Sequence, residues 1–170
     1  MGPTDRPPPT TGFLLWHVSL RWRVAVDRAL APLDLTHATY GLLATLHGLS
    51  RDGLEPSQRE LADYSGLEPM YISKLARSLQ RSGLLKRAES QADPRAWRLT
   101  LTDRGNRVLR KAVATVQVLH DRLLAPLGGT KSTRSLELKD ALWVLLKSFE
   151  SHPRTKVRPA LRQPAGRRRK

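Results

Sequence analysis

The sequence predicts a mainly α-helical fold of six helices with one small β-hairpin, and three observations lead to this prediction. Apolar residues recur every three or four positions in six separate stretches, as they do in amphipathic helices. Alternation of apolar and polar residues is found at residues 97–101, which indicates a half-buried strand. Between residues 56 and 85, two short helical patterns flank a glycine. With 170 residues, the chain is long enough for one domain with a hydrophobic core.

The composition indicates a polyanionic partner. The formal net charge is +15, and residues 154–170 hold eight Lys and Arg without an acid, so the tail is strongly basic. The absence of cysteine excludes disulfides and cysteine-ligated zinc. The polar, proline-rich start does not resemble a signal peptide, and no apolar run reaches the ~18 residues of a membrane span. A cytoplasmic, nucleoid-associated protein is therefore expected.

The first two helices follow a proline-rich arm. Residues 1–12 hold four prolines and no apolar periodicity, so this arm is expected to be disordered. A helix is predicted over residues 13–31, ending at Pro32 because proline cannot continue the hydrogen-bond ladder. Thr36 is expected to cap a second helix that reaches about residue 49. The apolar faces of the two helices carry Leu15, Val18, Trp22, Val26 and Leu30, and Leu42, Leu43, Leu46 and Leu49.

Two short helices joined by a tight turn are predicted next. Ser57 and Glu60 have the spacing of a capping box, in which the serine hydroxyl accepts from the Glu60 amide and the glutamate reaches back. The second helix is expected over residues 68–81, with Pro69 tolerated in its first turn. This is the spacing of a helix-turn-helix. Ala62 is expected to let the two helices approach closely, and Gly66 to allow the turn between them. Ile72 and Leu75 are expected to seal the helices together, and Gly83 to end the second helix.

A wing is predicted after the helix-turn-helix. Residues 84–88 and 97–101 are candidate strands, and the charged segment between them is the connecting turn. Arg95 at its tip is expected to enter a minor groove, where narrow A·T regions attract arginine. Asp93 is expected to orient Arg95 through a charged hydrogen bond. The alternative is a solvated surface loop.

Two further helices complete the pattern. Thr102 or Asp103 is expected to cap a long helix that reaches about residue 124 and is broken at residues 126–129. A last helix is predicted over residues 132–150. The apolar faces carry Leu109, Val113, Val116, Leu119 and Leu123 in the long helix, and Leu138, Leu142, Leu145, Leu146 and Phe149 in the last one.

Three segments together resemble the MarR family of bacterial winged-helix regulators. They are Ala31-Pro32-Leu33-Asp34-Leu35-Thr36 with Tyr40, Leu43 and Leu46; the helix-turn-helix at 57–85; and Asp93-Pro94-Arg95-Ala96 followed by Leu99-Thr100-Leu101-Thr102-Asp103-Arg104-Gly105. The resemblance covers about residues 13–150. It implies a winged helix-turn-helix fold in an intertwined homodimer, joined through its N- and C-terminal helices. Such a dimer binds a pseudo-palindromic duplex and is often released by a small ligand.

The resemblance and the composition together divide the chain into five parts. These are a disordered arm at 1–12, a dimerisation helix at 13–35, the winged helix-turn-helix DNA-binding domain at 36–102, dimerisation helices at 103–150, and a basic disordered tail at 151–170. The tail could add nonspecific affinity for DNA or serve only as a solubilising end.

The outer face of the second helix of the helix-turn-helix is expected to enter a major groove. Lys74 or Arg77 could pair with guanine, and Met70 or Tyr71 could meet a thymine methyl group. Helix N-termini favour phosphate, although Ser57 could act only as a cap. A solvated helix face is the alternative for the whole group. The candidate DNA-binding residues are Ser57, Gln58, Arg59, Pro69, Met70, Tyr71, Ser73, Lys74, Arg77, Arg95 and Arg98.

A small aromatic or anionic effector is expected to bind beside the first two helices, where the resemblance implies a pocket against the long helix and the DNA-binding lobe. Arg21 or Arg23 could pair with a carboxylate. Ordinary core and surface roles are the alternative for each residue. The candidate pocket residues are Trp16, His17, Trp22, His37, Tyr40 and His47.

Neither a cofactor nor a catalytic role is expected. No pair among the five histidines has the i, i+4 spacing of a helical zinc site, and no phosphate loop or nucleophile elbow is present. The preferred hypothesis is a sequence-specific, double-stranded DNA-binding regulator, a repressor rather than an activator, released by ligand. A nonspecific architectural nucleoid protein is the alternative, favoured by the basic tail. A helix-turn-helix used for protein interaction is the third hypothesis.

Overall fold

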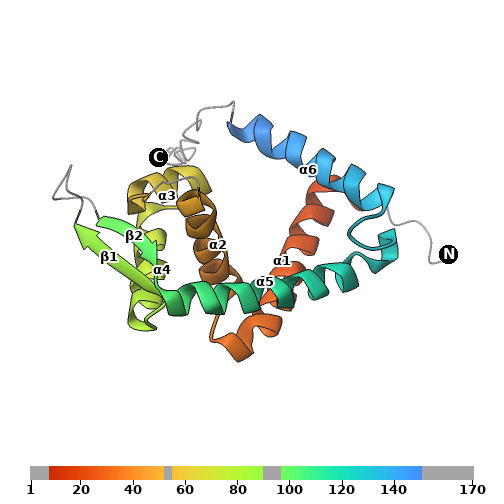
Figure 1. Cartoon of the computed structure of the whole chain (residues 1–170). Coiled ribbons are helices and arrows are strands. Elements are labelled where there is room, and N and C mark those ends of the chain that lie inside the picture. Colours follow the sequence, from red (N-terminus) through yellow and green to blue (C-terminus); the bar gives the residue numbers. More distant parts are fainter. Residues whose placement is uncertain (1–7, 52–54, 90–96, 151–170) are drawn as a thin grey trace, which may run out of the picture. The chain divides into compact units, whose positions relative to one another are not determined.

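The computed structural model describes residues 8–51, 55–89 and 97–150 and shows six helices with one antiparallel hairpin (Figure 1). The predicted element types and their order are confirmed. Residues 1–7, the wing tip with Asp93 and Arg95, and the tail at 151–170 lie outside the described residues. The elements are α1 Thr11–Leu30, α2 His37–Arg51, α3 Gln58–Ser65, α4 Pro69–Arg81, β1 Leu85–Glu89, β2 Trp97–Leu101, α5 Asp103–Leu123 and α6 Thr133–Glu150.

The chain divides into two compact units, Met1–Leu123 and Leu124–Lys170. The first holds α1 to α5 and the hairpin. The second holds a short 3₁₀ turn and α6, whose first turn is capped because the Ser132 hydroxyl accepts from the Ser135 amide at 3.2 Å. Within the described residues, no helix is long and apolar enough to cross a membrane.

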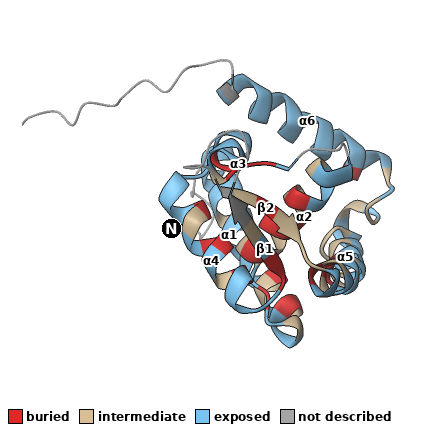
Figure 2. Ribbon diagram, turned by 60° about the vertical axis from the view of Figure 1, so that its left-hand side comes forward, coloured by how far each residue is buried: buried red, intermediate tan, exposed pale blue. Residues whose placement is uncertain are grey.

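The core of the first unit is built from α1 to α5 and the hairpin, and part of it lies where α2, α3, α4 and the hairpin meet. Leu46, Leu61, Ile72 and Leu99 come from four different elements and are each at most 1% exposed. The buried residues lie on the inward sides of these elements, as Figure 2 shows. The helix-turn-helix and the wing therefore share one hydrophobic core and cannot move independently without exposing it.

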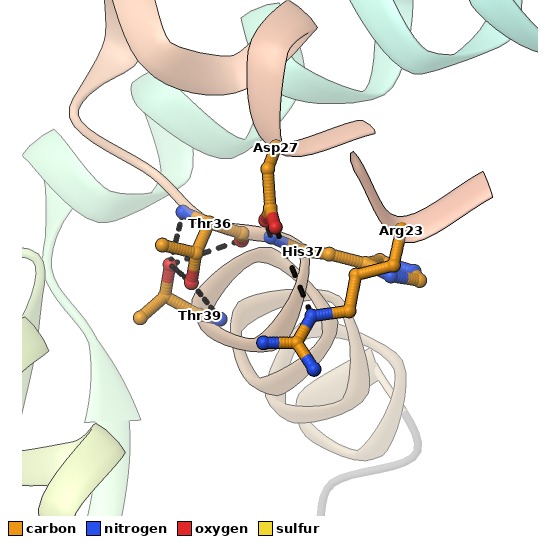
Figure 3. Close-up of polar contacts among 5 residues, drawn as sticks. All are labelled: Arg23, Asp27, Thr36, His37 and Thr39. Carbon is orange, nitrogen blue, oxygen red and sulfur yellow. Dashed lines mark hydrogen bonds and ion pairs between the residues drawn. The ribbon is translucent and has the colours of Figure 1, made fainter. Parts of the chain in front are cut away.

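The start of α2 is fixed by two threonines, as Figure 3 shows. The Thr36 hydroxyl accepts from the Thr39 amide at 3.2 Å, and the Thr39 hydroxyl accepts from the Thr36 amide at 2.8 Å. The predicted cap at Thr36 is therefore confirmed, with a reciprocal partner. Asp27 of α1 also accepts from the His37 amide at 2.6 Å, which ties the two helices together.

Two predicted boundaries need correction. The arm was expected over residues 1–12, but α1 begins at Thr11, because the Thr10 hydroxyl accepts from the Phe13 amide at 3.3 Å and caps the helix. The first strand begins at Leu85 rather than 84. The Leu84 amide still donates to the Leu79 carbonyl in the closing turn of α4. That turn depends on Gly83 at φ +67°, as expected for a helix-terminating glycine.

The hairpin is joined to α3 by a short backbone pairing that the sequence pattern did not predict. Ser57 forms an isolated antiparallel bridge with Arg98, and the Leu99 amide donates to the Pro56 carbonyl at 3.1 Å. The residues just before α3 thus pair with the backbone of β2, as a short third strand would. This fixes the base of the wing relative to the helix-turn-helix.

Gly105 supports the packing of α5 on the hairpin, and this gives a testable prediction. A Cβ at this position would lie 2.0 Å from the Leu84 carbonyl oxygen, a backbone atom that also accepts from the Thr102 amide. Gly105→Ala should therefore lower the free energy of unfolding by about 3 kcal/mol or more, by overpacking a fixed junction. Urea denaturation followed by circular dichroism measures this change.

Gly48→Ala is the matched control, because a Cβ at this α2 position meets nothing within 4 Å. Its higher helix propensity should raise stability by up to about 1 kcal/mol. Equal effects of the two substitutions would contradict the packing role of Gly105.

Candidate nucleic-acid interface

The α4 helix has one buried face and one exposed face. Ile72, Leu75, Ala76 and Leu79 are buried, in agreement with the predicted seal between the two helices of the helix-turn-helix. The opposite face is exposed. Met70 on this face is 84% exposed, so it packs little against the rest of the chain. A long apolar side chain held in water on a rigid helix suits a surface that becomes covered by a partner. This face carries Pro69, Met70, Tyr71, Lys74 and Arg77, with Ser73 partly buried beside them.

The first turn of α4 is positioned by backbone contacts. Pro69 is the first helical residue, where its missing amide costs nothing, and the Glu68 carbonyl accepts from the amides of Tyr71 and Ile72. Further along, Nε of Arg77 donates to the Ser73 carbonyl at 3.3 Å. The Arg77 side chain is therefore held along the helix axis, close to Ser73.

The start of α3 contains the predicted capping box. The Ser57 hydroxyl accepts from the Glu60 amide at 3.2 Å, and Oε2 of Glu60 accepts from the Ser57 amide at 2.6 Å. These bonds from Ser57, with the nearby Arg98 charge, hold the pKa of the Glu60 carboxyl below its ordinary value. Ser57 itself is buried, so the structure gives it the capping role, whereas Arg59 is exposed.

Gln58 bridges α4 and β1 rather than extending freely from the helix N-terminus. With the amide nitrogen facing Ser73, the orientation that satisfies both ends, Gln58 donates to Ser73 Oγ at 3.2 Å. Its carbonyl oxygen accepts from Arg87 Nε at 3.3 Å and Nη2 at 2.7 Å. Sequence reasoning missed Arg87. One feature of the sequence could have pointed to it. Arg87 lies two residues after Leu85 and so on the same face of the strand, where the alternating pattern predicts an apolar side chain.

Arg98, one of the candidate DNA-binding residues, forms contacts at the base of the hairpin. Its Nη1 donates to the Glu55 carbonyl at 2.6 Å and lies 3.2 Å from Oε2 of Glu60. This places Arg98 as a link between β2 and the start of α3. Arg95 and Asp93 lie outside the described residues.

A cavity of about 400 Å³ lies between α1, α2, α3 and α4. Its volume is within the range of small-molecule sites. Of the six residues expected to line a pocket, His37 lies in its wall, together with Arg23. The lining residues are Arg23, His37, Ala38, Gly41, Leu42, Thr45, Leu61, Ser65, Leu67, Tyr71, Ile72 and Leu75.

The other five expected pocket residues lie elsewhere. His17 is in ring contact with Trp16, at 4.6 Å between centroids. Trp22 contacts the His120 ring at 5.0 Å, and burial followed by the His37 charge lowers the pKa of His120. Tyr40 packs against the core, and burial raises the pKa of its hydroxyl. His47 is exposed.

Asp27 contacts two of the residues that line the cavity, His37 and Arg23 (Figure 3). One carboxylate oxygen accepts from the His37 amide, and the other lies 3.8 Å from Nε of Arg23. Arg23 is 68% exposed, and a distance of 3.8 Å makes this a loose ion pair. The guanidinium therefore remains available to a stronger anionic partner.

Sequence comparisons place this architecture among known regulators. The family described as ArnR1-like, winged-helix domain matches residues 32–119. The uncharacterized HTH-type transcriptional regulator YdcH of Bacillus subtilis (strain 168) is 32% identical over 124 residues, covering 73% of this chain and 82% of that protein. The HTH-type transcriptional repressor Rv2887 of Mycobacterium tuberculosis (strain H37Rv) is 34% identical over 127 residues, covering 75% and 87%.

Solved structures agree with these relatives. A MarR-family transcriptional regulator from Rhodococcus sp. RHA1 matches with a TM-score of 0.66 and 28% identity, over 79% of this chain and 91% of that one. The repressor CouR bound to a 23-mer DNA duplex gives 0.67 and 29%, over 83% and 92%. CouR from Rhodococcus jostii RHA1 bound to p-coumaroyl-CoA gives 0.71 and 26%, over 85% and 96%. The hairpin beside a two-faced α4 is thus a wing beside a recognition helix, and the chain belongs to the MarR family of winged helix-turn-helix transcriptional regulators.

Proposed function

We propose that this regulator is a homodimeric, cytoplasmic repressor that binds a pseudo-palindromic DNA duplex sequence-specifically and is released by a small effector. The observation that carries the proposal is the exposed face of α4, on which apolar and cationic side chains stand opposite a fully packed core face. The relatives named as repressors, and CouR in its DNA-bound form, support the same function. Binding at a promoter would block access by RNA polymerase.

The α4 face has the side chains that base recognition in a major groove requires. Lys74 and Arg77 can donate to guanine, and Met70 or Tyr71 can contact a thymine methyl group. Arg59 at the start of α3 and Arg95 in the wing are assigned to the DNA backbone and the minor groove, with Asp93 orienting Arg95. Two such helices in a dimer would enter successive major grooves about 34 Å apart.

Arg77→Ala and Lys74→Ala test the base-contact assignment. Each should weaken binding to a duplex selected from random-sequence DNA by about 1–3 kcal/mol and relax sequence preference at one position per half-site. Arg95→Ala should weaken binding with a smaller change in major-groove preference. Fluorescence anisotropy titration gives the affinities, and repeating the selection with each variant gives the preferences.

Competition with random duplex separates the repressor from an architectural protein. A sequence-specific regulator retains its selected duplex in the presence of excess random DNA, whereas a nonspecific binder releases both equally. Wild-type affinity and preference in both the Arg77 and the Lys74 variants would contradict the assignment of α4 as the recognition helix.

The homodimer is supported by apolar side chains left in water on the terminal helices. Such a density of large exposed hydrophobic residues exceeds what a monomer surface usually carries, and it marks a surface that a partner covers. These residues are Phe13, Leu14, Leu15, Trp16, Val18, Leu20 and Val24 on α1, and Leu136, Leu138, Leu142, Trp143, Val144, Leu145, Leu146 and Phe149 on α6. In the proposed dimer they pack against a second copy of the chain.

Charge placed on the α6 face should separate the protomers. The double variant Leu142→Asp/Leu145→Asp should shift the mass in sedimentation equilibrium from twice 19.1 kDa to the single-chain value. Lys139→Asp on the same helix is the control and should remain dimeric. A double variant that keeps the dimer mass would argue against α6 as an interface.

The cavity is the proposed effector site. Its wall joins α1 and α2 to the recognition helix through Tyr71, Ile72 and Leu75, so an occupant would contact α4 directly. Arg23 is the group that would pair with an anion, and the apolar remainder suits an aromatic ring. Release of DNA requires that the effector bind the unbound geometry more tightly than the DNA-bound one. CouR bound to p-coumaroyl-CoA supports an effector of this class.

Arg23→Ala should reduce the effector response without weakening DNA binding. With p-coumaroyl-CoA and benzoate as probes, release of the selected duplex should require about tenfold more ligand in this variant, the cost of one charged hydrogen-bond pair. Arg21→Ala is the matched control, because Arg21 is exposed on the same helix and outside the cavity wall. Equal responses of the two variants would remove Arg23 from the site.

A further inference from the structure

One wall of the cavity proposed to bind the effector follows α2 for about two turns. It is lined by His37, Ala38, Gly41, Leu42 and Thr45, a spacing that places all five on one side of the helix. At the rise of an α-helix, His37 and Thr45 are about 12 Å apart along the axis. The site therefore has the length for a compound that extends along α2 and meets different side chains at its two ends.

The two ends of this wall differ in chemistry. At the start of α2, Asp27 accepts from the His37 amide at 2.6 Å and lies 3.8 Å from Nε of Arg23, so the Arg23 cation stands at this end of the cavity. At the other end, Thr45 has a neutral hydroxyl. The cavity therefore suits an occupant with an anionic group at one end and a hydrogen-bonding group at the other.

The Thr45 hydroxyl is half-buried and has no hydrogen-bond partner within residues 8–51, 55–89 and 97–150. A threonine inside a helix commonly donates to the carbonyl four residues earlier, which here belongs to Gly41. Ser65, which also lines the cavity, differs, because its hydroxyl donates to the Ala62 carbonyl and accepts from the Leu67 amide, both at 3.4 Å. Thr45 thus keeps its hydrogen-bonding capacity for an occupant of the cavity.

Gly41 leaves open space in the middle of the same wall. Glycine weakens a helix interior relative to alanine. A Cβ at Gly41 would nevertheless meet nothing within 4 Å, and the backbone there has no positive φ. Neither a close neighbour nor the backbone conformation therefore requires glycine at this position. Its effect is to expose the α2 backbone to the cavity, where a flat ring can approach closely.

We propose that Gly41 and Thr45 determine which effector the cavity accepts. The occupant is a ring compound that packs on α2 at Gly41, with its anionic group at Arg23 and a hydroxyl group at Thr45. The inference rests on the proposed function and specifies the chemistry of its effector site. Because a hydroxyl buried without a partner costs affinity, Thr45 sets the preference for a hydroxylated ring, and Gly41 sets the space that the ring occupies.

Two probes that differ in one hydroxyl group test Thr45. Isothermal titration calorimetry of the full chain, without DNA, compares para-hydroxyphenylpropanoate with phenylpropanoate. The wild-type protein should bind the hydroxylated probe about tenfold more tightly, and Thr45→Val should reduce this ratio to about one. Thr115→Val is the matched control. Its hydroxyl donates to the Lys111 carbonyl on α5, outside the cavity wall, so the wild-type ratio should remain. An unchanged ratio in Thr45→Val would overturn the role of Thr45.

Leucine at two positions of α2 tests Gly41. Gly41→Leu should weaken the binding of both probes at least tenfold, because the new side chain takes the space of the ring. Gly48→Leu is the matched control, since Gly48 is exposed on the same helix and outside the cavity wall. Leucine favours a helix more than glycine does, so both variants should fold, which thermal unfolding checks. Equal affinities of the two variants would overturn the role of Gly41.

The outcomes separate this inference from the function on which it rests. A wild-type protein without preference for any selected duplex contradicts the repressor itself. A wild-type protein that binds its duplex specifically, but binds neither probe or binds both equally, contradicts only the assignment of Gly41 and Thr45.

Discussion

The candidate DNA-binding surface of this regulator depends on how the first turn of α3 is held. The Ser57 hydroxyl accepts from the Glu60 amide, and the Glu60 carboxylate accepts from the Ser57 amide. The same carboxylate forms an ion pair with Arg98 of β2. The preceding Pro56 carbonyl accepts from Leu99. The start of α3, the base of the wing and the pairing with β2 therefore depend on the same few residues. Because these contacts share the same residues, loss of one of them should also weaken the others.

This polar junction lies on an apolar one. Leu61 of α3, Ile72 of α4 and Leu99 of β2 are almost completely buried together, with α2 behind them. Close packing makes such a core resist small displacements. The orientation of α4 relative to the wing is thus set by buried side chains, and the exposed residues of α4 take their positions from that packing.

Local chemistry was predictable from the sequence, and contacts between distant segments were not. The capping box at Ser57, the turn at Gly66 and the stop at Gly83 depend on neighbours within a few residues, and the structure confirms all three. The pairing of Pro56 with Leu99 joins positions 43 residues apart, so no periodicity records it. The contact between Gln58 and Arg87 could not be predicted for the same reason, and the sequence analysis named Gln58 only as a candidate DNA-binding residue.

Tyr71 belongs to two surfaces at once. It is 40% exposed on the outer side of α4 and also lines the cavity that Arg23 lines. A side chain shared in this way cannot be optimised for one surface alone. In the proposed function, a substitution at position 71 would therefore alter both the DNA-contacting face and the effector site. An engineer who alters the proposed effector site at position 71 would therefore need to measure the preferred DNA sequence of each variant as well.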